Sequence, residues 1–136
     1  MPIQFTVNEK ENYFTAKWDG LLSDTELIPS YEYFFNSKDW HSGLNELADL
    51  STVDFSEISC DAIVLLSRYA KTFYISHDIT VVKTATYCIE EAGKGFAKIY
   101  DIWTKDSPEY FRIFNDKQKA IFWLTNSGVQ QELQLY

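Results

Sequence analysis

Cysteine, histidine, glycine and proline are all scarce in this sequence. Its 136 residues include 2 Cys, 2 His, 5 Gly and 3 Pro. Cys60 and Cys88 lie far apart and neither belongs to a CxxC motif, and His41 and His77 have no cysteine or paired carboxylate at the spacing of a zinc site. We therefore expect no metal site and no cofactor, two reduced thiols and two surface imidazoles.

Basic residues are in the minority as well. The chain has 12 Lys and Arg against 20 Asp and Glu, which gives a formal net charge of −8. Nucleic acids and anionic membrane surfaces are bound mainly through clusters of Lys and Arg. Neither is therefore expected as a partner.

Long apolar runs are also missing. The opening MPIQF has no basic segment followed by an apolar stretch, and no run approaches the ~18 apolar residues of a membrane span. These absences predict a cytoplasmic protein with no signal peptide and no membrane anchor.

Hydrophobic and aromatic residues, in contrast, are abundant. They make up 46% and 17% of the chain, which rules out a disordered protein and predicts a core or pocket built largely of rings. A chain of this length buries roughly two-thirds of its unfolded surface, so it can fold without disulfides. Without linkers or repeats, we expect one domain over residues 1–127 and a tail over 128–136.

Periodic hydrophobic patterns predict nine elements. The strands are expected at residues 3–7, 13–18, 44–50, 80–89 and 110–114, with a polar turn at 8–12. A first helix begins near Ser23 or Asp24, or later because Pro29 is unfavourable beyond the first turn. Either Ser56 or Ser59 caps the second helix, the third covers residues 92–103, and Asp116 and the glycine at position 128 bound the fourth.

The resulting order, β-β-α-β-α-β-α-β-α, predicts an α/β domain with a mixed, mostly parallel sheet flanked by helices. Two helices carry apolar stripes that are expected to face the core, made of Ile58, Ala62, Leu65, Leu66, Tyr69 and Phe73 in the second and Ala92, Phe96, Ile99, Tyr100 and Trp103 in the third. The strand at 44–50 fits a buried strand less well, because it contains Glu46 and Asp49.

Three stretches give the chain a family resemblance. They are Trp18-Asp19-Gly20 after the first hairpin, Leu47 to Ser51 before a long helix, and Gly95 to Tyr100 followed by Phe111 to Asp116, Ala120 and Trp123-Leu124. With this element order, the chain resembles the SpoIIAA-like family of uncharacterised proteins related to the STAS fold. The resemblance covers nearly the whole chain and implies the fold of the anti-sigma-factor antagonists.

The same resemblance implies a phosphorylation site. Antagonists of this fold carry a phosphorylated serine at the start of the helix after the third strand, in an Asp-Ser-Ser-Gly-type motif, and Ser59 falls near that position. Cys60 and Ala62 stand where glycines would be, which weakens the match. Ser59 is thus a phosphorylation candidate, while Ser56 or Ser59 as a plain helix cap is the favoured interpretation.

Two further sets of residues are candidates for a binding or catalytic site. Gly93-Lys94-Gly95 lies where α/β folds bind anions, but it matches no phosphate-binding motif, so close helix packing explains its glycines better. Acid–base catalysis is the other possibility considered for Asp49, Asp54 and Glu57. No nucleophilic residue pairs with them, so a solvated acidic loop is the better interpretation.

Aromatic residues are densest in and after the first helix. Consecutive rings on one helix cannot all face the same core, so some ring surface is expected to be exposed, to lie in a homodimer contact or to line an apolar pocket. The candidates for a ligand or partner surface are Tyr31, Phe34, Phe35 and Trp40, beside Tyr33.

These observations favour a function other than catalysis. The first hypothesis is a non-enzymatic regulatory or interaction domain that binds a protein partner or a second copy of itself. The second is a carrier of a small apolar, lipid-like molecule between the first helices and the sheet. The third is a phosphorylation switch at Ser59.

Overall fold

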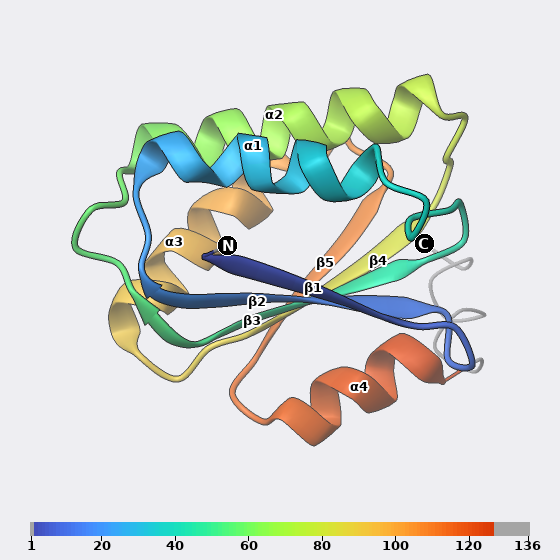
Figure 1. The fold of residues 1–136 in the computed structure, drawn as a ribbon. Helices are drawn as coiled ribbons and strands as arrows, with labels where there is room; N and C mark the ends of the chain where they lie inside the picture. The colour runs from blue at the N-terminus through green and yellow to red at the C-terminus, as the bar shows by residue number, and fades with distance from the viewer. Residues whose placement is uncertain (1, 127–136) are drawn as a thin grey trace.

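The fold is a five-stranded sheet with helices on both faces, described for residues 2–126 by a computed structural model (Figure 1). The element order is the predicted one. The elements are β1 (Ile3–Asn8), β2 (Tyr13–Leu21), α1 (Asp24–Phe35), β3 (Asn45–Asp54), α2 (Cys60–Ser76), β4 (Val82–Tyr87), α3 (Glu91–Trp103), β5 (Glu109–Phe114) and α4 (Lys117–Thr125).

The strands lie in the order in which they occur in the chain. β1 pairs antiparallel with β2 through a short hairpin, and β2, β3, β4 and β5 pair in parallel. Parallel strands need long crossovers, which α1, α2 and α3 provide. The mixed, mostly parallel sheet expected from the sequence is therefore confirmed.

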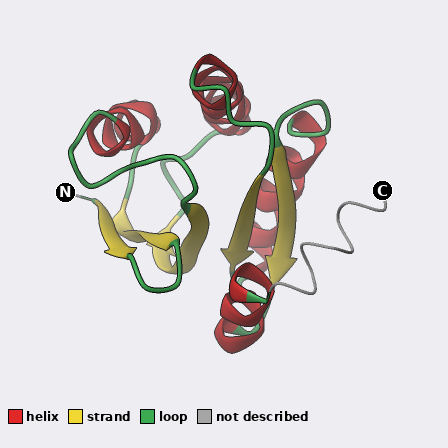
Figure 2. Ribbon diagram, turned by 90° about the vertical axis from the view of Figure 1, so that its right-hand side faces the viewer, coloured by secondary structure: helices red, strands yellow, loops and turns green. Residues whose placement is uncertain are grey.

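Helices cover the two faces of the sheet unequally. α1, α2 and α3 pack on one face and α4 packs alone on the other, and a view turned by 90° shows the sheet between α4 and the first two helices (Figures 1 and 2). The larger core lies under α1–α3, and a smaller one, with Leu47, Ala85 and Trp123, lies under α4. Because both faces are covered, polar side chains on the central strands are buried.

The first helix begins early in spite of its proline. Ser23 caps α1, its backbone N–H donating to the Glu26 carboxylate at 2.9 Å, and Pro29 lies in the second turn on the exposed side. The predicted start at Ser23 or Asp24 is confirmed, and the alternative of a later start was wrong. Pro29 removes one backbone donor, but the cap and the burial of Leu27 and Tyr31 hold the first turns.

The predicted apolar stripes are only partly buried. Leu65 in α2 and Trp103 in α3 are exposed, and so is Ala92. In α3 the fully buried positions are Gly93 and Ala97, so this helix approaches the core through small residues. Helical spacing alone did not distinguish them from neighbouring large side chains.

Two sequence predictions fall outside the described residues. The glycine at position 128 as the stop of α4 and the tail at 128–136 lie there, whereas α4 is described to its end at Thr125. Within residues 2–126, no helix combines the length and the apolar character needed to cross a membrane.

Candidate functional site

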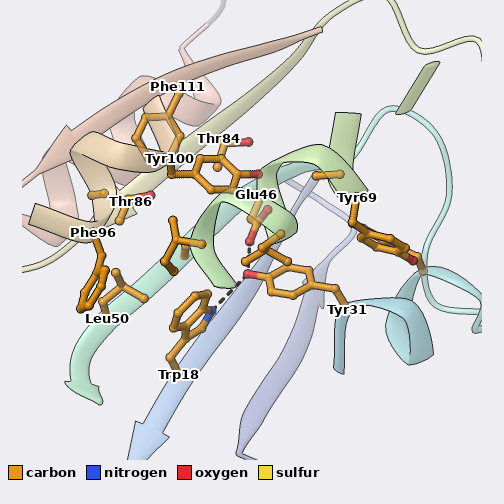
Figure 3. A pocket seen from close by; sticks show the side chains of 16 residues that line it. Trp18, Tyr31, Glu46, Leu50, Tyr69, Thr84, Thr86, Phe96, Tyr100 and Phe111 are labelled. Atoms are coloured by element: carbon orange, nitrogen blue, oxygen red, sulfur yellow. Dashed lines mark hydrogen bonds between the residues drawn. The ribbon is translucent and has the colours of Figure 1, made fainter. Parts of the chain in front are cut away.

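An apolar cavity lies between the three-helix layer and the sheet (Figure 3). The centres of water molecules have about 40 Å³ of space in it, enough for a few waters but not for a large ligand at rest. Hydrophobic side chains form most of its wall, and seven polar or amphipathic ones reach it: Trp18, Tyr31, Glu46, Tyr69, Thr84, Thr86 and Tyr100.

Three side chains from different elements form a buried hydrogen-bond chain at the cavity. The indole Nε1 of Trp18 donates to the Tyr31 hydroxyl at 3.1 Å, and that hydroxyl donates to Glu46 Oε2 at 2.6 Å. Figure 3 shows the carboxyl group of Glu46 directed toward Tyr31 and Trp18 from β3. No described residue donates to the other carboxyl oxygen, Oε1, which is free for a further partner.

A second buried carboxyl group lies behind the cavity wall. Glu109, at the start of β5, accepts a hydrogen bond from the Tyr100 hydroxyl at 3.0 Å through Oε1. Its Oε2 and the hydroxyl groups of Thr84 and Tyr74 are buried and make no hydrogen bond of good geometry to a described residue, although Thr84 lies close enough to Glu109 to oppose the rise in the pKa of that carboxyl group. Unpartnered buried polar groups are costly and rare, so this region invites a functional explanation.

Burial changes the acidity of both carboxyl groups. Desolvation raises the pKa of Glu46 from 4.5 to about 7, against the opposing effect of the Tyr31 hydrogen bond. Desolvation and the charge of Glu46 raise the pKa of Glu109 to about 8, against the opposing hydrogen bond from Tyr100. Near neutral pH the two carboxyl groups therefore hold protons that an exposed glutamate would have lost.

The strand pleat places these groups on the cavity face. Glu46, Ala48 and Leu50 alternate along β3 toward the helices, while Leu47 packs under α4. On β4, Thr84 faces the cavity. Successive side chains of a strand ordinarily point to opposite faces of the sheet. Both faces are buried here, so an acidic residue at a position that points toward the helices is unusual.

Sequence reasoning expected an apolar pocket with Tyr31 and Phe35 among its candidates, but it missed the buried acids. Glu46 was noticed only as a poor fit to a buried strand, and Glu109, next to Pro108, was outside the predicted last strand. The sequence signal that could have indicated the site is an acidic residue inside an otherwise apolar strand. Burial of a carboxyl group is energetically costly, so an acidic residue in such a strand is a candidate for a functional role.

The four aromatic candidates lie close together but not on an exposed surface. Tyr31 and Phe35 line the cavity, and Phe34 stacks on Phe5 with ring centroids 4.5 Å apart. Trp40 is half-buried against Phe35. Of the alternatives expected from the sequence, lining of an apolar pocket fits Tyr31 and Phe35, whereas exposure does not fit Tyr31, Phe34 or Phe35, which are at most 5% exposed.

The rings are buried because α1 lies in the angle between the sheet and α2. Phe34 points to β1 and β2, where it meets Phe5 and Phe14, and Phe35 points to Phe73 of α2. Two neighbouring positions of one helix can thus be buried against different elements. Tyr33 is the exposed ring of α1, at 71%.

Ser59 caps α2, as one of the two sequence interpretations expected. Its Oγ accepts from the N–H of Ala62 at 3.2 Å and donates to the Asp24 carboxylate at 2.7 Å. Asp24 also accepts from the backbone N–H of Ser59 at 2.7 Å, which joins α1 to α2. A phosphate here would meet the negative charge of Asp24, and phosphorylation of Ser59 stays a prediction.

The acidic set at the end of β3 is divided in the structure. Asp54 and Glu57 are exposed, but Asp49 is buried, so the solvated-loop interpretation was wrong for Asp49. Burial alone would raise the pKa of Asp49, but hydrogen bonds from Ser51 and the charge of Lys117, 3.4 Å away, outweigh it and lower the pKa.

The remaining sequence candidates have structural roles. A side chain at Gly93 would approach the Phe55 ring to 3.1 Å, so this glycine permits close packing of α3, while a side chain at Gly95 would meet open space. His41 and His77 are exposed. Within residues 2–126 no group of three or more His, Cys, Asp or Glu side chains could hold a metal ion.

No protein-family model and no curated protein matches the chain. Among solved structures, it is similar to an uncharacterized protein of the DUF3478 family with a SpoIIAA-like fold from Shewanella loihica PV-4. The identity is 18% and the TM-score 0.53, over 90% of this chain and 91% of that chain. The chain therefore has a SpoIIAA-like fold, as the resemblance of its sequence implied.

Proposed function

We propose that this protein binds a small molecule with an apolar body in the cavity between α1–α3 and the sheet. The observation that supports the proposal is an apolar cavity lined by the Glu46 carboxyl group, one oxygen of which accepts no hydrogen bond from a described residue. Binding sites for small molecules typically combine apolar walls with a few convergent polar groups. This is the carrier role that the sequence left as its second hypothesis.

A ligand needs more room than the resting cavity offers. Four of the aromatic side chains in the wall are half-buried, and they lie on α2, α3 and β5: Tyr69, Phe96, Tyr100 and Phe111. Rotation of such rings, or a small outward movement of α3, enlarges the cavity without disturbing the sheet. The small residues Ala70 and Ala97 lie among the larger side chains of α2 and α3 in the wall.

Filling the cavity tests the proposal. Ala97→Leu places a larger side chain in the cavity, and we expect it to weaken binding of the apolar dye Nile red at least about tenfold, or about 1.4 kcal/mol. Ala92→Leu on the exposed side of the same helix is the control and should bind as the wild type does. Native mass spectrometry of freshly purified wild type should show a co-purifying mass that Ala97→Leu lacks. A wild type with no such mass and no dye binding would contradict the proposal.

Self-association is the second candidate function, and it continues the first hypothesis from the sequence. The end of α3 exposes two adjacent large hydrophobic side chains, Ile102 at 61% and Trp103 at 49%. β5 is an edge strand of the sheet, and its unpaired edge can accept a strand from a second copy. A regulatory domain that acts through a homodimer would use such a surface.

Sedimentation velocity checks this candidate. If Ile102 lies in a homodimer contact, wild type sediments as a dimer and Ile102→Lys shifts it to monomer, with a dissociation constant raised at least about tenfold. Leu65→Lys, at an equally exposed position of α2, is the control and should leave the dimer intact. A monomeric wild type at all concentrations removes this candidate.

A further inference from the structure

We propose that the ligand is an amphiphilic amine whose ammonium group pairs with the Glu46 carboxylate while its apolar body fills the cavity. The inference rests on the proposed function and specifies the chemical class that the cavity takes. Three features of the described residues support it: the free oxygen of Glu46, the absence of a cation on this face, and the surroundings of the carboxyl group.

The first feature is the geometry of Glu46. The residue is only 5% exposed, and Tyr31 fixes its Oε2 with a short hydrogen bond of 2.6 Å. Trp18 in turn donates to the Tyr31 hydroxyl and so fixes its orientation. The second oxygen, Oε1, receives no hydrogen bond from a described residue, although the side chain lines the cavity. A positioned acceptor with a free oxygen is complementary to an N–H donor.

The second feature is the lack of a positive charge near this carboxyl group. Among the described residues that line the cavity there is no Lys, Arg or His. The neighbouring strand β4 contains a buried lysine, Lys83. Its side chain points to the other face of the sheet. There its Nζ donates to the backbone carbonyl of Trp123 at 2.9 Å. A buried carboxylate without a cation is unfavourable, and a bound ammonium group would supply the missing charge.

The third feature is what surrounds Glu46 from each packed element. The titratable groups that face it are Tyr31 from α1, Tyr74 from α2, Tyr100 from α3 and Glu109 from β5. All four are neutral or negative in every protonation state, so none can compensate the Glu46 carboxylate. Because burial raises the pKa of Glu46 to about 7, an incoming ammonium group would displace a proton to solvent near neutral pH.

A pair of probes of nearly equal shape tests the charge requirement. 2-Phenylethylamine and 2-phenylethanol share the same apolar body and differ in the ammonium and hydroxyl ends. Isothermal titration at about pH 8 should show the amine binding at least tenfold more tightly than the alcohol, or about 1.4 kcal/mol. Titrations at about pH 6 in phosphate and in Bis-Tris, two buffers with different ionisation enthalpies, should show release of up to about one proton per amine bound.

Two matched variants separate charge from structure. Glu46→Gln keeps the shape and an acceptor for Tyr31 but removes the charge, so the preference for the amine and the proton release should both disappear. Glu109→Gln removes the other buried carboxyl group, which does not line the cavity, and should retain the preference. Circular dichroism and Nile red binding establish that each variant is folded and has an open cavity.

The outcomes distinguish this inference from the proposed function. If the alcohol binds as tightly as the amine, or if neither probe binds, the amine inference is overturned. The cavity proposal fails separately, when wild type carries no co-purifying mass and Ala97→Leu and Ala92→Leu behave alike toward Nile red. An amine preference that persists in Glu46→Gln would also overturn the inference, because the charge would then be recognised elsewhere.

Discussion

The Glu109→Gln variant is expected to lose much less stability than the wild type as the pH rises from about 5 to about 9. Glu109 is buried at 6% exposure and its Oε2 has no partner among the described residues. Burial raises its pKa from 4.5 to about 8, with a further contribution from the charge of Glu46. The folded protein thus binds this proton more tightly than the unfolded chain does.

The direction of the pH effect follows from linkage. Below about pH 4.5 the carboxyl group is protonated in both states, so its contribution to stability is at its maximum. Between about pH 4.5 and about pH 8 the unfolded chain has lost the proton and the folded protein retains it, so the free energy of unfolding falls as the pH rises. Each unit of pKa difference is worth about 1.4 kcal/mol, which makes the total loss a few kcal/mol.

Urea denaturation at a series of pH values measures this loss. In Glu109→Gln the amide cannot ionise, so the loss should shrink by a few kcal/mol across the range, and the variant should be the more stable protein at about pH 9. Glu11→Gln, at an exposed position of the first turn, is the control and should follow the wild type. A Glu109→Gln curve parallel to that of the wild type would show that Glu109 is not a buried acid.

The fold was predictable from the sequence because its signals are local. Alternation identified the hairpin at residues 3–18, and Ser23, Ser59 and Asp116 were recognisable as helix caps, which hydrogen bonds to the following residues support. An alternating order of strands and helices leaves few topologies once crossovers are short and right-handed. At the start of α1, Pro29 left a later start open as an alternative, and the cap at Ser23 outweighs this proline.

An apolar pocket beside the first helix was among the expectations, but its polar lining was not predictable, because it depends on contacts between distant segments. Trp18, Tyr31 and Glu46 come from β2, α1 and β3, and their hydrogen bonds join residues 13 and 15 positions apart. In the sequence, Glu46 looks like a solvated acid, since charged residues are seldom fully buried. Only the packing of α1–α3 on one face and α4 on the other shows that this position is buried.

The aromatic residues of α1 illustrate the same limit. Their number correctly indicated a ring-rich core, but helical periodicity alone did not show which rings are exposed or that Phe34 and Phe35 are both buried. They are both buried because two different elements, the sheet and α2, pack on adjacent sides of α1. The angle between three packed elements is a property of the tertiary structure.

Phe35→Ala is expected to have the largest effect on stability of any single substitution in α1. The ring stacks on Phe73 with centroids 4.1 Å apart and an interplanar angle of 8°, and Trp40 and Tyr74 approach it at 5.9 Å. It thus lies at the centre of the contacts that join α1 to α2. Removal of a buried Phe side chain costs about 3–5 kcal/mol, because apolar contacts are lost and a cavity remains.

Such a cost is a large fraction of the stability of a domain, which is typically about 5–15 kcal/mol. Thermal and urea denaturation should therefore show a much lower melting temperature and midpoint for Phe35→Ala. Tyr33→Ala, two positions earlier on the exposed side of the same helix, is the control and should change the free energy of unfolding by no more than about 0.5 kcal/mol. Equal costs for the two variants would contradict the assignment of Phe35 to the core.

Phe35 also lines the cavity, so the same position links stability to binding. If Phe35→Ala is too unstable to purify, Phe35→Leu keeps most of the apolar volume and should lower the free energy of unfolding by a smaller amount. Both substitutions enlarge the cavity, and the folded variant should take up Nile red more tightly than the wild type at the temperature where both are folded. Stability and dye affinity should therefore change in opposite directions at this position, because a ring that fills the space between α1 and α2 also occupies space that a ligand would need.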